Sequence, residues 1–409
     1  MVINDSSSPD LNDPTAPQPD RGRLAFVDVL RVVVIILVVA HHSAQPYGPT
    51  GGEWAVTDPA NTEWLGPFFA VNAAFGLGLL FLLAGYFVPR SYDRKGGSRF
   101  LKDRWRRIGV PLVIFALVMN VPAAYLIESV RPSMGEFVRS LYDSGWQNVY
   151  VHLWFLGHLL VYSLGYVIWR SVADRRTSRP PRTWPVPSHA SIVVFAIGLA
   201  LVTWVVRIWY PIDEWVPLFF IVAAEPAHMP QYVSLFAVGV VAYRGDWLRR
   251  LPQRLGMIWL GVGLTASAGT YVFKLGAPDR WDEVTADGGF VAQSLVSSTW
   301  EALICVGLCL GLITLFRTMF TRTNRVLVAM AAASYAAYIL HLTIVVLLQL
   351  GILELDLPAT AKFGLVTAFG VVLSFGIAHL SRRIPGLRTI LGTTPSPSEV
   401  VPSDSEASV

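Results

Sequence analysis

Residues 24–43 read LAFVDVLRVVVIILVVAHHS, a run that is apolar except for Asp28, Arg31 and the polar residues at its end. A single helical crossing of a lipid bilayer needs about 20 apolar residues. This segment therefore predicts a transmembrane helix that carries an unusual pair of charges near its start.

Further apolar runs of similar length follow along the chain, and together they predict an all-α polytopic membrane protein with about ten transmembrane helices. The composition agrees, because 15% of the residues are charged, whereas soluble domains have about 25%. One run, 228–243, is short for a crossing. The run before it, 216–224, is the alternative to this span, as a re-entrant or interfacial piece. The other expected crossings are 66–88, 108–127, 153–169, 190–210, 255–275, 291–316, 326–350 and 361–381.

The two ends of the chain differ from this pattern. Residues 1–20 contain aspartates and prolines but no Lys or Arg, so they lack the charged start of a signal peptide, and we expect a disordered tail. Residues 393–409 are rich in Ser, Pro and Thr and predict a second disordered tail. One transmembrane domain, 21–392, remains between them.

The basic residues predict the orientation of this domain. With both termini in the cytoplasm, 26 of the 32 Lys and Arg residues fall on the inner side. Such an asymmetry is the positive-inside pattern of membrane proteins. The net charge of +4 is small and dispersed, so nucleic acid is not an expected partner.

The polar residues of the first span are candidates for chemistry. His42 follows Arg31 by eleven residues, about 16 Å along a helix and within roughly 20° of the same face. Asp28 lies near that face as well, whereas His41 points away. Charged groups at membrane depth are costly and usually face a protein interior or a polar cavity. A purely structural Asp28–Arg31 ion pair, with His42 at a helix end, is the alternative.

Other ionisable residues fall inside predicted spans. His341, His158 and His152 are expected in the outer half of the bilayer with His42, which predicts a polar pocket there. For each histidine taken alone, a hydrogen bond to a neighbouring hydroxyl or carbonyl is the better explanation. Glu301 is a further intramembrane charge. No metal is expected, because no two histidines have helical i, i+4 spacing and the only cysteines, Cys305 and Cys309, lie in one apolar run.

The loop before the third span contains eight basic residues between positions 90 and 107. Most of them are explained as positive-inside anchors. Arg104 and Arg107 differ, because they are three residues apart on one helical face at the mouth of a span. Two guanidinium groups so placed suit the phosphate oxygens of a ligand.

In order and spacing, these motifs resemble the acyltransferase 3 family of integral-membrane O-acyltransferases. The resemblance extends over residues 24–392. Its motifs here are Asp28 with Arg31-x10-His42, Phe81-Leu-Leu-Ala-Gly85-Tyr86-Phe87, Arg104-x-x-Arg107 before Pro111, His152-Leu-Trp154-Phe155-Leu156, Ser334-Tyr335-x-x-Tyr338-x-x-His341 and Arg382-Arg383-Ile-Pro385.

The resemblance implies transfer of an acyl group, with acetyl expected, from cytoplasmic acyl-coenzyme A to a hydroxyl of a sugar, cell-envelope glycan, lipid or secondary metabolite. In this interpretation Arg104 and Arg107 hold the phosphates of the co-substrate, and Arg31 lines the channel. His42 is then the general base. His341 or Glu301 orients or polarises it, and the sequence does not choose between them. We expect a multi-pass protein of the bacterial cytoplasmic membrane.

Two other functions remain open from the residues alone. A proton-coupled secondary transporter would also have polar groups at mid-membrane, although no internal repeat is visible. A sensor or binding protein that uses the same pocket without turnover is the third. The sequence leaves open a homodimer, and it leaves open whether Trp54 and Trp64 stack on a sugar or form an aromatic belt at the interface.

Overall fold

The structure is a computed structural model that describes residues 24–49, 54–127, 132–143, 146–176, 184–218 and 222–391. The tails predicted at 1–20 and 393–409 lie outside these residues. The long elements are α1 (Ala25–Ala44), α2 (Leu65–Lys95), α7 (Trp154–Arg176), α8 (His189–Arg207), α9 (Met229–Gly245), α11 (Gln253–Gly276), α13 (Ala292–Met319), α14 (Arg325–Ile352) and α15 (Ala359–Ser381).

The third predicted crossing is a chain of shorter pieces. It runs through α3 (Gly97–Arg104), the π-helix η2 (Trp105–Gly109), α4 (Val110–Phe115), the π-helix η3 (Ala116–Asn120) and α5 (Val121–Ile127). The remaining short elements are η1 (Gln45–Tyr47), α6 (Met134–Asp143), η4 (Trp146–Leu153), η5 (Pro226–His228), α10 (Trp247–Arg250), α12 (Pro278–Val284) and α16 (Pro385–Ile390).

The prediction of an all-α polytopic membrane protein is confirmed. Among the described residues, nine helical segments are long and apolar enough to cross a bilayer. They correspond to nine of the ten runs expected from the sequence. The tenth, 228–243, is the 17-residue helix α9, which at 1.5 Å per residue is about 26 Å long and thus shorter than a bilayer core of about 30 Å.

The run before α9 is a small antiparallel hairpin. Strands β1 (Val216–Leu218) and β2 (Val222–Ala224) pair with Val216 opposite Ala224. The residues of β2 are buried. The run 216–224, for which the sequence offered a re-entrant or interfacial piece, therefore contains two short paired strands, and β2 is packed into the protein.

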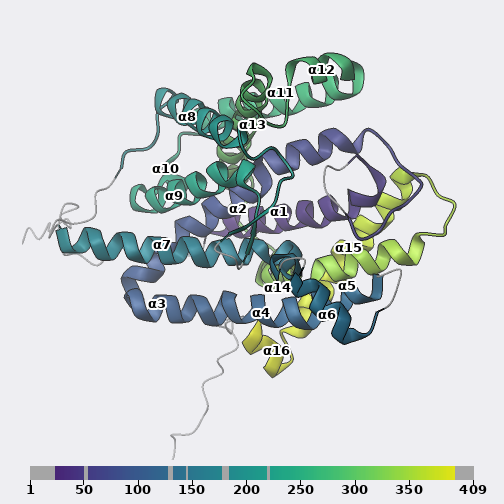
Figure 1. The fold of residues 1–409 in the computed structure, drawn as a ribbon. Coiled ribbons are helices and arrows are strands. Elements are labelled where there is room, and N and C mark those ends of the chain that lie inside the picture. The colour runs from purple at the N-terminus through teal and green to yellow at the C-terminus, as the bar shows by residue number, and fades with distance from the viewer. Residues whose placement is uncertain are drawn as a thin grey trace, which may run out of the picture.

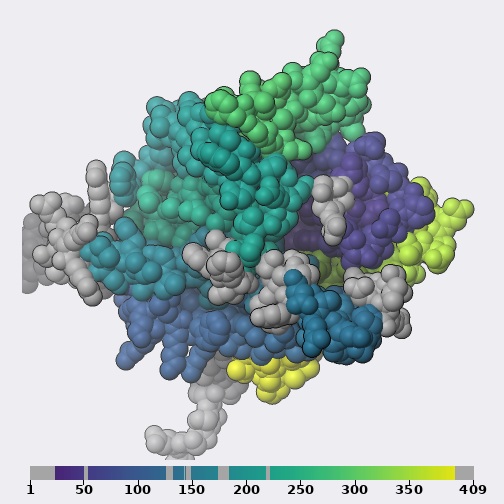
Figure 2. Space-filling view, viewed as in Figure 1, coloured from purple at the N-terminus to yellow at the C-terminus, as the bar shows by residue number. Residues whose placement is uncertain are grey.

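Helix α1 lies at the centre of the bundle and packs against α2, α13, α14 and α15. Figure 1 shows α8, α11 and α13 along one side of the molecule and α3 and α4 along the opposite side. Figure 2 shows the same division on the surface, with the green residues of α11 and α12 at one edge and the blue residues of α3 to α6 at the other.

The motif in α2 has a packing role. A Cβ atom on Gly85 would lie 2.2 Å from the carbonyl oxygen of Phe236, and one on Gly239 would lie 2.1 Å from that of Leu82. Small residues allow α2 and α9 to approach closely, as is common between membrane helices. Tyr86, which follows Gly85 in α2, donates its hydroxyl to the carboxylate of Asp246 at 3.0 Å and so fixes the end of α9.

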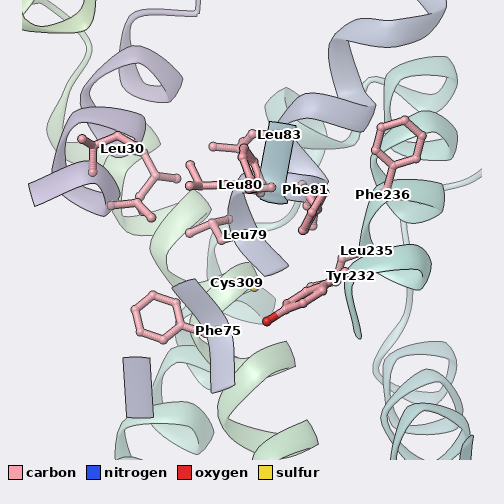
Figure 3. Packing of buried hydrophobic residues seen from close by; sticks show 14 of the residues in the cluster. Leu30, Phe75, Leu79, Leu80, Phe81, Leu83, Tyr232, Leu235, Phe236 and Cys309 are labelled. Carbon is pink, nitrogen blue, oxygen red and sulfur yellow. The ribbon is translucent and has the colours of Figure 1, made fainter. Parts of the chain in front are cut away.

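The core fills the space between these helices with apolar side chains. Figure 3 shows Leu80 and Phe81 of α2 between Leu30 of α1 on one side and Phe236 of α9 on the other. The outer surface is also apolar in many places, with exposed side chains such as Val194 on α8 and Val372 on α15. Such outer faces suit contact with lipid.

Candidate active site

His42 lies near the end of α1 with one ring nitrogen bound to the backbone. Its Nδ1 atom is 2.8 Å from the carbonyl oxygen of Val38, one helical turn earlier. A carbonyl oxygen only accepts, so Nδ1 carries the proton of the neutral ring and Nε2 carries the lone pair. The helix therefore holds the imidazole in the tautomer that leaves Nε2 available as a base.

His341 on α14 meets this ring from a position 299 residues further along the chain. Its Nδ1 atom donates to the carbonyl oxygen of Tyr338 at 2.6 Å, which leaves a lone pair on Nε2. That Nε2 atom is 3.4 Å from Nδ1 of His42, and the two ring centroids are 5.0 Å apart. His341 is fully buried. The single Nδ1 proton of His42 is therefore shared between the Val38 carbonyl at 2.8 Å and the Nε2 lone pair of His341 at 3.4 Å.

A third imidazole, His152, adjoins the pair. Its centroid is 4.9 Å from that of His341, and its Nε2 atom donates to the carbonyl oxygen of Ile339 at 3.0 Å. The hydroxyl of Tyr338 donates to the carbonyl oxygen of His152. The backbone just before it is strained, because Val151 has φ 40°, which is rare for a β-branched residue and recurs at functional sites.

The sequence places His152 in the expected polar pocket without giving it a role, and the structure puts its ring against His341. The motif at 152–156 places a histidine beside a predicted span, and the motif at 334–341 places two tyrosines one and two helical turns before His341. Only the packing of η4 on α14 brings these two motifs into contact.

The neighbouring histidine, His41, lies in different surroundings. Its ring lies edge-on to Phe69 with the centroids 5.1 Å apart, and it also approaches Phe68. It is His42, not His41, whose ring meets His341. This matches the geometry of an α-helix, in which adjacent residues point about 100° apart.

Asp28 and Arg31 pair with each other near the start of α1. The guanidinium Nη2 atom lies 2.8 Å from Oδ1 of Asp28. The Arg31 side chain is 39% exposed and that of Asp28 is 16% exposed. The Arg31 side chain is therefore partly exposed as well as paired with Asp28.

Arg104 and Arg107 lie where α3 gives way to the π-helix η2. The guanidinium carbon of Arg104 is 5.1 Å from the centroid of the Phe100 ring. Arg107 donates to Asp103 at 2.9 Å, and its side chain is 43% exposed. The two arginines are close enough to repel each other electrostatically. Two neighbouring guanidiniums of this kind form a suitable site for phosphate oxygens.

Tyr335 of α14 supports the backbone of this arginine pair. Pro111 has no N–H and so cannot donate to the carbonyl oxygen of Arg107, its i−4 partner in an α-helix. The hydroxyl of Tyr335 donates to that oxygen at 2.6 Å. The residues Tyr335, Tyr338 and His341 thus contact, in turn, the arginine segment, the His152 backbone and His42.

Glu301 has partners of its own. Arg207, a fully buried side chain at the end of α8, donates from Nη1 to Oε1 at 3.0 Å and from Nη2 to Oε2 at 2.6 Å. His228 approaches the same carboxylate, with its Nε2 atom 3.7 Å from Oε2. No bond links Glu301 to His42 among the described residues. The sequence left open whether His341 or Glu301 contacts His42, and in the structure His341 makes this contact.

His228 also pairs with Glu225, 2.8 Å from its Nδ1 atom. Burial lowers the pKa of His228, but the Glu225 and Glu301 carboxylates together outweigh burial and raise this pKa. Burial would raise the pKa of Glu225, and His228 lowers it instead. This ion pair fixes the segment between the hairpin and α9.

His158 is satisfied inside the core. It is fully buried, its Nε2 atom donates to the carbonyl oxygen of Ala223 at 3.2 Å, and Tyr162 lies 3.3 Å from its Nδ1 atom. Both ring nitrogens therefore have partners, and the role of His158 is to hold β2 against α7.

The chain is similar to known proteins over most of its length. A family model described as "Acyltransferase domain" matches residues 24–379. The chain is similar to the protein named "Glucans biosynthesis protein C" of Salmonella schwarzengrund (strain CVM19633), with 24% identity over 267 residues, which cover 63% of this chain and 68% of that protein. Proteins of the same name from Salmonella agona (strain SL483) and Salmonella heidelberg (strain SL476) are similar to the same extent. No solved structure matches the chain.

Proposed function

This chain belongs to the acyltransferase domain family, and we propose on that premise that it is a membrane O-acyltransferase that uses cytoplasmic acyl-coenzyme A. The transferred group is acetyl, and the acceptor is a hydroxyl of a cell-envelope glycan. The relatives that the chain resembles are named for glucan biosynthesis, which favours a glycan over a lipid or a secondary metabolite. The protein acts in the bacterial cytoplasmic membrane.

The observation that carries this proposal is the His42–His341 pair. A general base needs a free lone pair and a neighbour that stabilises its charged form. His42 has its lone pair on Nε2, since Nδ1 is bound to Val38. When Nε2 takes a proton, the positive charge of the ring is stabilised through the Nδ1 proton by the Val38 carbonyl and the lone pair of His341.

The reaction then follows from these groups. Nε2 of His42 takes the proton of the acceptor hydroxyl, and the oxygen attacks the thioester carbonyl carbon. A C–O bond forms and the C–S bond breaks. The leaving thiolate takes the proton from His42, so the products are the ester and free coenzyme A thiol. Direct transfer needs no acyl-histidine intermediate.

The supports for the two ends of the co-substrate lie on one helix. Tyr335 binds the backbone of Arg107, and His341 contacts His42. These residues are six positions apart on α14, which corresponds to about 9 Å along its axis. Phosphates held by Arg104, Arg107 and Arg31 therefore leave the extended arm of the coenzyme to bring the thioester toward His42.

Labelled acetyl-coenzyme A tests the proposal. Membrane vesicles that contain the protein are given the labelled co-substrate with and without a glucose oligosaccharide, and free thiol and labelled product are measured. We expect thiol release only with acceptor, and a loss of about 10²- to 10⁴-fold in the His42→Gln variant. His41→Gln is the matched control and retains activity. A secondary transporter would move solute without thiol release, and that result would refute the proposal.

A further inference from the structure

Gln349 links the loop that contains Trp54 to His42, the proposed base. This side chain is fully buried and lies two helical turns beyond His341 on α14. Its amide nitrogen donates to the carbonyl oxygen of His42 at 2.9 Å, and its amide oxygen accepts from Nε1 of Trp54 at 2.9 Å. A buried amide is costly unless it is hydrogen-bonded. Both of its polar atoms are satisfied here by residues around the site.

Trp54 is placed differently from an ordinary interfacial tryptophan. A tryptophan in an aromatic belt keeps its polar end at the headgroup level. The N–H of Trp54 instead points inward to Gln349, and its ring centroid lies 5.6 Å from that of His42. Trp64, the other tryptophan of this loop, packs edge-on against Phe363 with the centroids 5.9 Å apart. The belt explanation therefore fits Trp64 but not Trp54.

A second contact fixes the same loop. Lys362, near the start of α15, lies 2.8 Å from Oδ2 of Asp58, and both side chains are almost completely buried. Lys362 also donates to the carbonyl oxygen of Leu353 at 2.9 Å. A buried charge pair persists only when its remaining hydrogen bonds are made. The loop is thus held on both α14 and α15, and the indole is ordered before any ligand binds.

We infer that Trp54 is one wall of the acceptor site and binds the ring of a carbohydrate, and that Gln349 is its positioning residue. This inference rests on the proposed function. A sugar ring presents C–H bonds on its face and hydroxyls at its edge. Its face packs on an indole while an edge hydroxyl lies within about 2.6–3.2 Å of a base. A rigid wall also lowers the entropic cost of binding.

Kinetics with both substrates test the wall. In the Trp54→Ala variant the KM for a glucose oligosaccharide is expected to rise about tenfold, because the variant loses the ring on which the sugar face packs. The KM for acetyl-coenzyme A stays unchanged. Trp54→Phe keeps a ring and has a smaller effect. Trp64→Ala is the matched control and leaves the acceptor KM within about twofold.

A double-mutant cycle tests the positioning role of Gln349. Gln349→Met keeps the shape of the side chain but removes its hydrogen bonds, and we expect it to raise the acceptor KM in the wild-type background. In the Trp54→Phe background, which already lacks the indole N–H, the same change should raise the acceptor KM less than in wild type, because only the bond to the His42 carbonyl is left to lose. Full additivity of the two changes would overturn this role.

A direct binding measurement separates this inference from the proposed function. Binding of the oligosaccharide to the detergent-solubilised protein is followed by ligand-observed NMR, without acyl-coenzyme A. Weaker binding by Trp54→Ala than by wild type supports the wall, whether or not transfer is seen. Equal binding overturns it, and so does an equal rise in KM for a long-chain alcohol acceptor. Absence of thiol release with every hydroxyl acceptor would refute the proposed function instead.

Discussion

At the scale of single residues, the site depends on which ring nitrogen of each histidine carries the proton. Backbone carbonyls decide this for His42 and His341, because each carbonyl accepts from a ring Nδ1 atom. The result is a directed pair, in which the lone pair of His341 faces the proton of His42. Removal of His341 should therefore destabilise the protonated, charged form of His42 more than it changes the position of the ring.

The His341→Ala variant tests this directional pairing. We expect kcat to fall about 10- to 100-fold, since a hydrogen bond to a charged group is worth about 1.5–3 kcal/mol. The KM for acetyl-coenzyme A should not change. Steady-state kinetics of purified protein measure both constants. A fall in stability with normal kcat would show that His341 has only a structural role.

Arg104 and Arg107 give a second prediction at this scale. Arg104→Gln and Arg107→Gln should each raise the KM for acetyl-coenzyme A about tenfold, because each removes a charge-assisted contact to phosphate. The acceptor KM should stay the same. Arg106→Gln is the control, since Arg106 is an exposed neighbour in the same segment. An equal effect of all three changes would indicate general attraction of anions.

At the scale of elements, α14 joins the two ends of the site. Its motif places Tyr335, Tyr338 and His341 at successive turns, and each makes a contact with a different segment. The motif could be recognised from the sequence, but its partners could not. That Tyr335 replaces the N–H missing at Pro111 became clear only from the packing of α14 beside η2.

The segment between β2 and α9 should respond to pH. His228 has a raised pKa and stabilises the fold fully below about pH 6.5, losing this contribution as pH rises through its own pKa. Glu225 has a lowered pKa and stabilises the fold above about pH 4.3, losing this contribution as pH falls through its own pKa. The ion pair is therefore strongest between these values.

Melting curves at several pH values measure this effect. The difference in Tm between wild type and Glu225→Gln should be largest between about pH 4.5 and 6.5 and should shrink on both sides. Glu354→Gln, which changes an exposed glutamate, is the control and should show no such maximum. A difference in Tm that does not vary with pH would mean that the pair contributes packing only.

At the scale of the whole molecule, the orientation in the membrane stays a prediction from the charge distribution. This orientation requires that α9 crosses the membrane, although α9 is shorter than the nine candidate spans among the described residues. The close contact of α2 with α9 at Gly85 and Gly239 supports this count, because it packs α9 along its length against a membrane-spanning helix.

Cysteine labelling checks the orientation. The native cysteines, Cys305 and Cys309, are both buried, so the chain is a suitable background. We expect Ser98→Cys to react with an impermeant maleimide only in permeabilised cells, because its loop carries many basic residues. Asp282→Cys, in an acidic outer loop, should react in intact cells. The opposite pattern would invert the predicted topology.

The sequence by itself determined the membrane-spanning helices, the family resemblance and the residue types of the site. Length of an apolar run, charge and motif spacing are local properties, so they can be read without a fold. The tertiary structure decided the partners. It brought His341 to His42 and His152 to His341, paired Glu301 with Arg207 and turned the indole of Trp54 toward Gln349. Such contacts join residues up to 299 positions apart and depend on how helices pack, which no local pattern encodes.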